Sequence, residues 1–171
     1  AAGAPTQQAL RPALLAFAIP GFGCIAGGGL VAAAIAPAPT EHGAWAVAYL
    51  VLVGGIAQLA LGAGQALLAV RTPSPATIRT QVVGWNAGNA VVIAGTLANL
   101  TVLTGLGAAV LVVVLALFVF GVRGGAAGNG TGDSPDAARR PDWLLHGFRT
   151  LVVVLLVSIP IGLVLSHLRH G

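Results

Sequence analysis

The sequence predicts an all-α protein, a multi-pass transmembrane helical bundle that crosses the bilayer about five times. Hydrophobic residues make up 57% of the chain, and its mean hydropathy is +0.94. Only 7% of the residues are charged, whereas a soluble domain carries about 25%. Uncharged runs longer than the ~20 residues that span a membrane recur along the chain. We therefore treat residues 1–171 as a single transmembrane domain.

The individual spans follow from apolar segments separated by polar or proline-containing loops. The predicted spans are residues 12–36, 44–70, 80–99, 102–122 and 148–167. Loops at 36–43 and 71–75 contain the prolines that punctuate such segments, and 99–104 is expected to be a tight uncharged turn. Residues 123–146 are rich in Gly, Asp and Arg, which predicts a flexible cytoplasmic loop.

Arginine placement predicts the orientation. All eight basic residues are arginines, and five spans with the N-terminus inside place seven of them in cytoplasmic segments and only Arg169 outside. Cytoplasmic loops of membrane proteins carry such an excess, so the N-terminus is expected inside and the C-terminus outside. The positive charge then sets topology and indicates no nucleic-acid partner. A composition rich in Ala, Gly and Val, without Lys or Met, is typical of a GC-rich bacterial genome, so we expect the bacterial inner membrane.

Small residues and prolines predict how the helices pack. Gly23 with Gly27, and Gly84 with Gly88, form GxxxG patterns, which let two helix backbones approach closely. These faces favour a homo-oligomer as well as packing within the chain. Pro20 is expected to kink or break the first span.

The predicted spans contain no deep Asp, Glu, Lys or Arg, which argues against a proton relay, an ion pump or a voltage sensor. Cys24 and Ser158 have no evident base to activate them as nucleophiles, so the chain is not expected to be an enzyme. The histidines all lie at predicted span ends, so neither a metal nor another cofactor is expected. They are His42, His146, His167 and His170.

Amides are the polar groups that remain inside the spans. Gln58 and Gln65 are seven residues apart, and Asn86 and Asn89 are three apart, so each pair shares a helix face. The hairpin between these spans turns near residues 74–75, which brings the glutamines close in depth to the asparagines. The resulting candidate solute path consists of Gln58, Gln65, Asn86, Asn89, Trp85 and Thr96.

Two roles for these amides remain open. They can bridge helices, through bonds worth about 0.6–2 kcal/mol each in membranes, or they can line a path for a small polar solute. The first role suits a non-catalytic structural or accessory subunit of a larger membrane complex. The second suits a channel or transporter for a small polar or weakly acidic solute, such as a short monocarboxylate that enters undissociated. The expected partners are bilayer lipid, the solute and further copies of the chain.

One stretch resembles a family signature. The sequence GGIAQL at residues 54–59, followed by Gly62, is similar to the "GGLAQ…G" signature of the acetate uptake transporter family. The turn at 72–77, the pair at 84–85 and the element RPALLAF at 11–17 resemble neighbouring family features. The resemblance covers about residues 12–90 and is specific over 54–62.

The resemblance implies a helical bundle that assembles into a symmetric oligomer, with a narrow solute path in each protomer. Carried over by position, Gln58 would line that path at its constriction. The chain departs from the family at Arg11, where the family has Asn, at Leu14, where it has Pro, and at Gln65, where it has an acidic residue. The family also has six spans, one more than predicted here.

Overall fold

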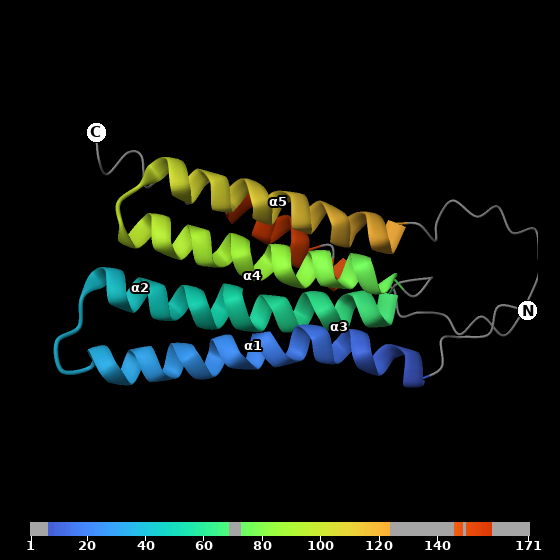
Figure 1. Ribbon diagram of the computed structural model, residues 1–171, viewed down its shortest axis with the longest axis horizontal. Coiled ribbons are helices and arrows are strands. Elements are labelled where there is room, and N and C mark those ends of the chain that lie inside the picture. The colour runs from blue at the N-terminus through green and yellow to red at the C-terminus, as the bar shows by residue number, and fades with distance from the viewer. Residues whose placement is uncertain (1–6, 69–72, 124–145, 149, 159–171) are drawn as a thin grey trace, which may run out of the picture.

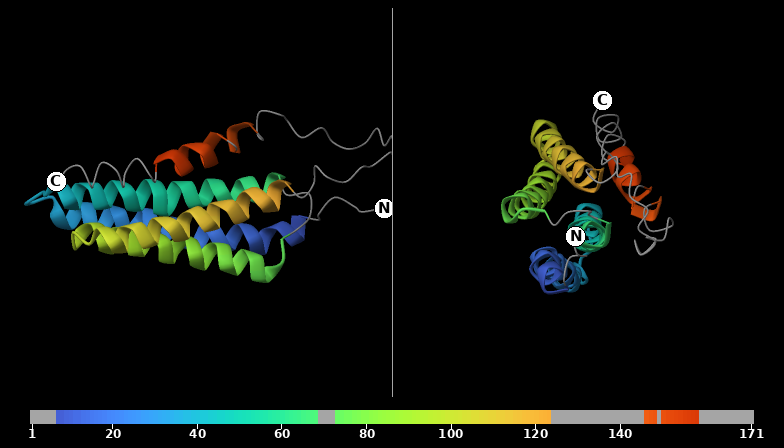
Figure 2. Two further views of the ribbon diagram at one scale, coloured as in Figure 1. Left: turned by 90° about the horizontal axis from the view of Figure 1, so that it is seen from above. Right: turned by 90° about the vertical axis from the view of Figure 1, so that its right-hand side faces the viewer.

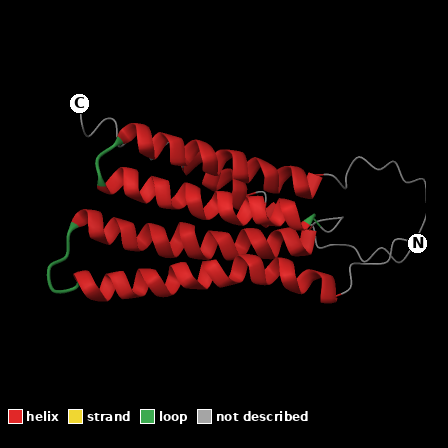
Figure 3. Cartoon of the chain, in the orientation of Figure 1, coloured by secondary structure: helices red, strands yellow, loops and turns green. Residues whose placement is uncertain are grey.

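The computed structural model of the protein describes residues 7–68, 73–123, 146–148 and 150–158, and these are helices joined by short turns, without a strand (Figure 3). The all-α fold class is therefore confirmed for this part of the chain. In order, the elements are α1 (Gln7–Ile35), α2 (Glu41–Tyr49), the π-helix η1 (Leu50–Ala57), α3 (Gln58–Leu68), α4 (Pro75–Leu97) and α5 (Thr101–Arg123). A shorter apolar helix follows at His146–Ser158, which we call the C-terminal helical segment.

The helices form two antiparallel hairpins that lie side by side (Figure 1). α1 packs along the continuous rod of α2, η1 and α3, and α4 packs along α5. Viewed along the bundle, the C-terminal helical segment lies beside α5 and α3 (Figure 2). The turns at 36–40 and 98–100 share one end of the bundle. We call the opposite end the arginine end, because Arg11, Arg79 and Arg123 lie there along their helices.

α2 and α4 begin earlier than their hydropathy predicts, because capping residues start them. The Thr40 side chain accepts a hydrogen bond of 3.1 Å from the backbone N–H of Gly43, so α2 begins at Glu41 and not at 44. The Ser74 hydroxyl accepts one of 3.1 Å from Thr77 N–H, and α4 begins at residue 75 instead of 80. Ser or Thr at the N-cap with Pro in the first turn is a strong helix start. The predicted loop at 36–43 was therefore too long.

The turn between α4 and α5 is shorter than the predicted 99–104. Asn99 adopts the left-handed conformation, with φ of 55°. Leu100 N–H donates to Gly95 C=O at 2.8 Å, and Asn99 N–H donates to Thr96 C=O at 3.2 Å. This pair of bonds is a Schellman motif, which ends a helix within three residues. As a result, α5 already begins at Thr101.

The described residues contain three helices that are long and apolar enough to cross a membrane, judged by length and composition. They are Leu14–Ile35, Glu41–Leu68 and Thr101–Phe120. α4 is 23 residues long, but its amides, threonines and Arg79 lower its hydropathy. The C-terminal helical segment is shorter still. A membrane protein is thus supported, while the count of five spans and the orientation stay predictions.

α1 runs as one helix from Gln7 to Ile35, so Pro20 does not break it.

Several sequence predictions lie outside the described residues. They concern residues 124–145 of the predicted loop, the part of the fifth predicted span from residue 159 on, and His167 with His170.

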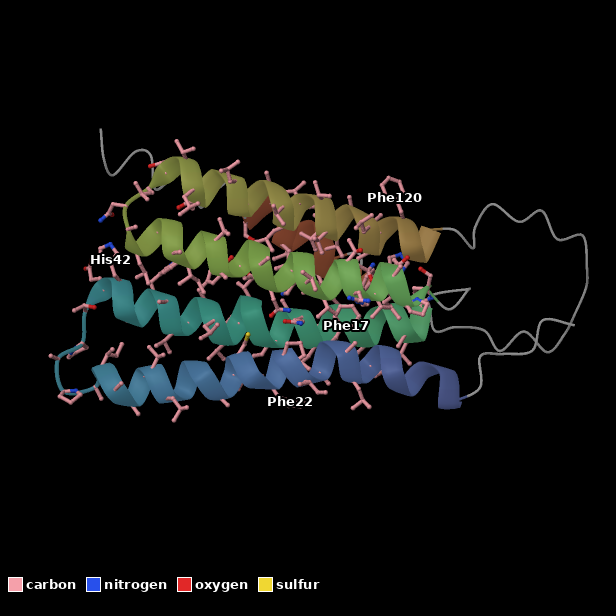
Figure 4. The ribbon with its side chains drawn as sticks, viewed as in Figure 1. Phe17, Phe22, His42 and Phe120 are labelled. Carbon is pink, nitrogen blue, oxygen red and sulfur yellow. The ribbon has the colours of Figure 1, made fainter. Side chains whose placement is uncertain are left out.

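The core lies where the two hairpins meet. Phe17 of α1 and Phe118 of α5 are both buried, and their ring centroids are 5.5 Å apart. Phe22 and Phe120 instead point away from the bundle, 63% and 67% exposed (Figure 4). Large apolar side chains on the outer surface are what a lipid-facing bundle presents, because lipid replaces water around it.

Glycines hold the helices of each hairpin close together. A Cβ on Gly62 would lie 2.5 Å from Cβ of Phe17 in α1, and one on Gly84 would lie 2.6 Å from Val114 in α5. The pattern at Gly84 and Gly88 thus faces α5. The pattern at Gly23 and Gly27 makes no close contact in the described part of the chain, because a Cβ on Gly23 would meet nothing within 4 Å and the nearest atom to one on Gly27 is 3.9 Å away. Its role in a homo-oligomer stays a prediction.

Glycines one or two positions from that pattern make the contact between α1 and the rod of α2, η1 and α3. A Cβ on Gly28 would lie 2.5 Å from the Val51 side chain, and one on Gly55 would lie 3.1 Å from the carbonyl oxygen of Gly21. The close approach predicted for α1 therefore exists, through Gly21 and Gly28.

Candidate functional site

A π-helix leads directly into the first amide. η1 covers eight residues and ends at Ala57, and Gln58 follows it as the first residue of α3. π-helical turns are rare and are often found at functional sites. Within η1, Gly54 packs against Cys24 and Gly55 against Ile25 of α1. The glycines of the signature-like stretch thus serve helix packing, and its glutamine follows the irregular turn.

Both glutamines of α3 are buried on a face that differs from the face toward α1. Gln58 is 1% exposed and Gln65 is 3% exposed. At about 100° per residue, their face is turned about 60° from the face of Gly55 and Gly62, which contacts α1. α3 also contacts α5, and η1 contacts α4. The amides therefore lie toward the interior between the two hairpins.

On α4, the buried polar face includes one residue that the sequence analysis missed. Trp85 is 1% exposed and Asn89 is 4% exposed, in keeping with their predicted place inside the bundle. Gln81 is 0% exposed and belongs with them, because it precedes Trp85 by four residues and Asn89 by eight. This spacing was the available signal, but the predicted solute path did not include Gln81.

The two asparagines bond to their own helix. Asn89 Nδ2 donates to the Trp85 carbonyl at 2.8 Å, and Asn86 Nδ2 donates to the Val82 carbonyl, also at 2.8 Å. Neither bond joins two helices. Asn86 is half-buried, as is Thr96. These two predicted path residues lie at the margin of the buried group.

Seven buried side-chain atoms of this group have no hydrogen-bond partner in the described part of the chain. Gln58 and Gln81 lack partners for both nitrogen and oxygen, whereas Gln65 Nε2, Trp85 Nε1 and Asn89 Oδ1 are single unpartnered atoms. Within the described residues, Gln58 therefore makes no hydrogen bond that bridges two helices. Burying an amide group without a partner costs about 1–3 kcal/mol. Because several unpartnered atoms lie in this one region, the fold carries this free-energy cost more than once.

The chemistry of this region is neutral. The buried polar or charged residues of the described chain are Gln58, Gln65, Gln81 and Asn89. They supply N–H donors and C=O acceptors without a fixed charge, and the Trp85 indole adds a donor. Such a group can bind a small polar molecule by hydrogen bonds alone. The described residues contain no cluster of His, Cys, Asp and Glu that could hold a metal ion.

Comparisons with protein-family models, with curated proteins and with solved structures found no match for this chain. The resemblance of residues 54–62 to acetate uptake transporters therefore stays a prediction.

Proposed function

We propose that the chain is a membrane channel or transporter for a small polar or weakly acidic solute, such as a short monocarboxylate. The observation that carries this proposal is the set of unpartnered amide and indole groups in the core between the hairpins. Polar groups at membrane depth need partners, and a solute that passes between the hairpins supplies them. Because the described core has no buried ionic side chain, the path favours solutes that cross without net charge.

Uptake of labelled acetate into liposomes tests this proposal. We expect the purified protein to raise uptake above that of empty vesicles. The Gln58→Leu, Asn89→Leu double variant is expected to lose about tenfold, because one hydrogen bond worth about 1.4 kcal/mol corresponds to a tenfold change. Asn86→Leu removes an amide that is half-buried and bonded to its own helix, so its loss should stay below about threefold.

Equal uptake by the wild type and the double variant would overturn the amide path. Native purification addresses the alternative function. A heterologous partner in stoichiometric amount, together with no uptake by the isolated chain, would make the protein an accessory subunit. Self-association without a partner is the expected result, as a homo-oligomer.

The proposal includes an orientation in the bacterial inner membrane, with five spans, the N-terminus inside and the C-terminus outside. Its support is that Arg11, Arg79 and Arg123 lie at one end of the bundle, whereas Glu41 and His42 lie at the other. A reporter that is active only in the cytoplasm should give full signal at the N-terminus and none at the C-terminus. Full signal from the C-terminal fusion would contradict this topology.

A further inference from the structure

Two glutamines differ from the other buried polar groups in how much of their hydrogen-bonding capacity is unused. Gln58 and Gln81 each have both the amide nitrogen and the amide oxygen buried and unpartnered. Asn89 has only its oxygen unpartnered, because its nitrogen donates to Trp85 C=O. Gln65 and Trp85 each contribute one unpartnered N–H group.

A primary amide with both groups unused selects for a particular solute chemistry. Its N–H donor and C=O acceptor lie side by side in one plane. An undissociated carboxylic acid or another primary amide presents the complementary pair, so it can form two hydrogen bonds with the glutamine at once. A carboxylate has acceptors only, so its second oxygen would face the glutamine oxygen. Without a cation in the site, a buried anion is also costly.

The two glutamines lie at different depths. Counted from the arginine end, Gln81 is the seventh residue of α4, and Gln58 lies ten residues before the end of α3. At a rise of 1.5 Å per residue, these positions are about 9 Å and 15 Å into the bundle. This depth difference of about 6 Å is comparable to the length of a two-carbon acid or amide.

We propose that Gln58 and Gln81 are successive binding positions for neutral solutes that carry a donor and an acceptor on one planar group: undissociated short carboxylic acids and small amides such as acetamide and urea. This inference rests on the proposed transport function and extends its solutes to amides. By the same count, Trp85 lies about 15 Å into the bundle, at the depth of Gln58, where its N–H group can donate to the second lone pair of the solute carbonyl. Gln65, three residues before the end of α3, adds an N–H donor nearer the arginine end. The carboxylate ion is rejected.

Titratable groups on the described elements around these positions do not change this preference. They are Arg11 and Cys24 on α1, Glu41, His42 and Tyr49 on α2, Arg79 on α4, Arg123 on α5 and His146 on the C-terminal helical segment. The burial of Arg11 and Arg123 is not described, and none of the other six belongs to the buried polar set, which consists of amides. Selection for the neutral form therefore comes from the hydrogen-bond pattern of the two glutamines.

Stopped-flow shrinkage of proteoliposomes tests the inference with acetamide and urea, alongside voltage-driven flux of potassium acetate at neutral pH. We expect the protein to raise acetamide and urea permeation about tenfold over empty vesicles, with no voltage-driven acetate current. Gln81→Leu and Gln81→Met remove the amide at similar volume, and each should lower amide flux about tenfold, the equivalent of one hydrogen bond of about 1.4 kcal/mol. Thr80→Val, an exposed neighbour on the same helix, should change the flux less than about twofold.

The outcomes separate this inference from the function on which it rests. A voltage-driven acetate current with amide permeation at background would overturn selection for neutral solutes and leave transport standing. Wild-type amide flux in a Gln81 variant that thermal unfolding shows to be folded would remove Gln81 as a binding position. No flux of acetate, acetamide or urea would refute the transport function itself.

Discussion

Gly107→Ala is expected to lower the free energy of unfolding by about 3 kcal/mol, the upper part of the usual range for an overpacked core. A Cβ at this position would lie 2.7 Å from the backbone nitrogen of Val92 and 2.9 Å from the carbonyl oxygen of Gly88. Backbone atoms cannot rotate away as a side chain does, so the methyl group forces α4 and α5 apart. Thermal unfolding in detergent, followed by circular dichroism, measures the loss.

Gly105→Ala is the matched control on the same helix. A Cβ there would meet no atom within 4 Å, so the substitution adds no clash. It should raise the free energy of unfolding by about 0.5–1 kcal/mol, because Ala loses less backbone entropy in a helix than Gly does. Similar melting temperatures for the two variants would contradict the close packing of α4 on α5.

Gln58→Leu is expected to stabilise the protein while it lowers solute flux. The wild-type amide is 1% exposed and has no partner for either polar atom within the described chain. Replacing it with an apolar side chain of similar volume removes a desolvation cost of about 1–3 kcal/mol. A helix-bridging amide would behave in the opposite way, since its loss would strand the partner group.

Leu61→Gln is the converse control for Gln58→Leu. Leu61 is 0% exposed and lies one turn beyond Gln58 on the same buried stripe of α3. Introducing an amide there should destabilise the protein by about 1–3 kcal/mol, because the new polar atoms gain no partner. The measurements are the melting temperature in detergent and acetate uptake in liposomes. A lower melting temperature for Gln58→Leu, with uptake unchanged, would assign Gln58 a structural role.

Element boundaries show where sequence reasoning is strong and where it is weak. The long apolar runs placed both ends of α5 and the C-terminal end of α1 to within one residue, because hydropathy is a local property. The start of α4 was placed five residues late, since Thr77, Arg79 and Thr80 appear polar although Ser74 caps the helix before them. The end of α4 depends on the left-handed conformation of Asn99. This conformation closes the turn in fewer residues than the predicted 99–104.

The candidate site was predicted in part. Helical spacing identified Gln58, Gln65 and Asn89 as polar residues of the interior, and burial agrees with this. Gln81 was missed because hydropathy cannot separate a buried polar residue near a helix end from an exposed one. The π-helix η1 was not predicted, since the composition of its eight residues does not differ from that of an apolar α-helix.

By itself, the sequence determined that the chain is helical and apolar enough for a membrane, and that its interior polar groups are amides without charge. These properties depend on residue type and on periodicity along a single helix. Only the tertiary structure decided that Gly21 and Gly28, and not Gly23 and Gly27, make the close contacts of α1 within the described chain. It also decided that Asn89 bonds within its helix while Gln58 and Gln81 have both polar atoms unpartnered. The reason is physical: close packing and hydrogen bonding depend on which atoms of other helices lie within a few ångströms, and that neighbourhood exists only after the helices have assembled.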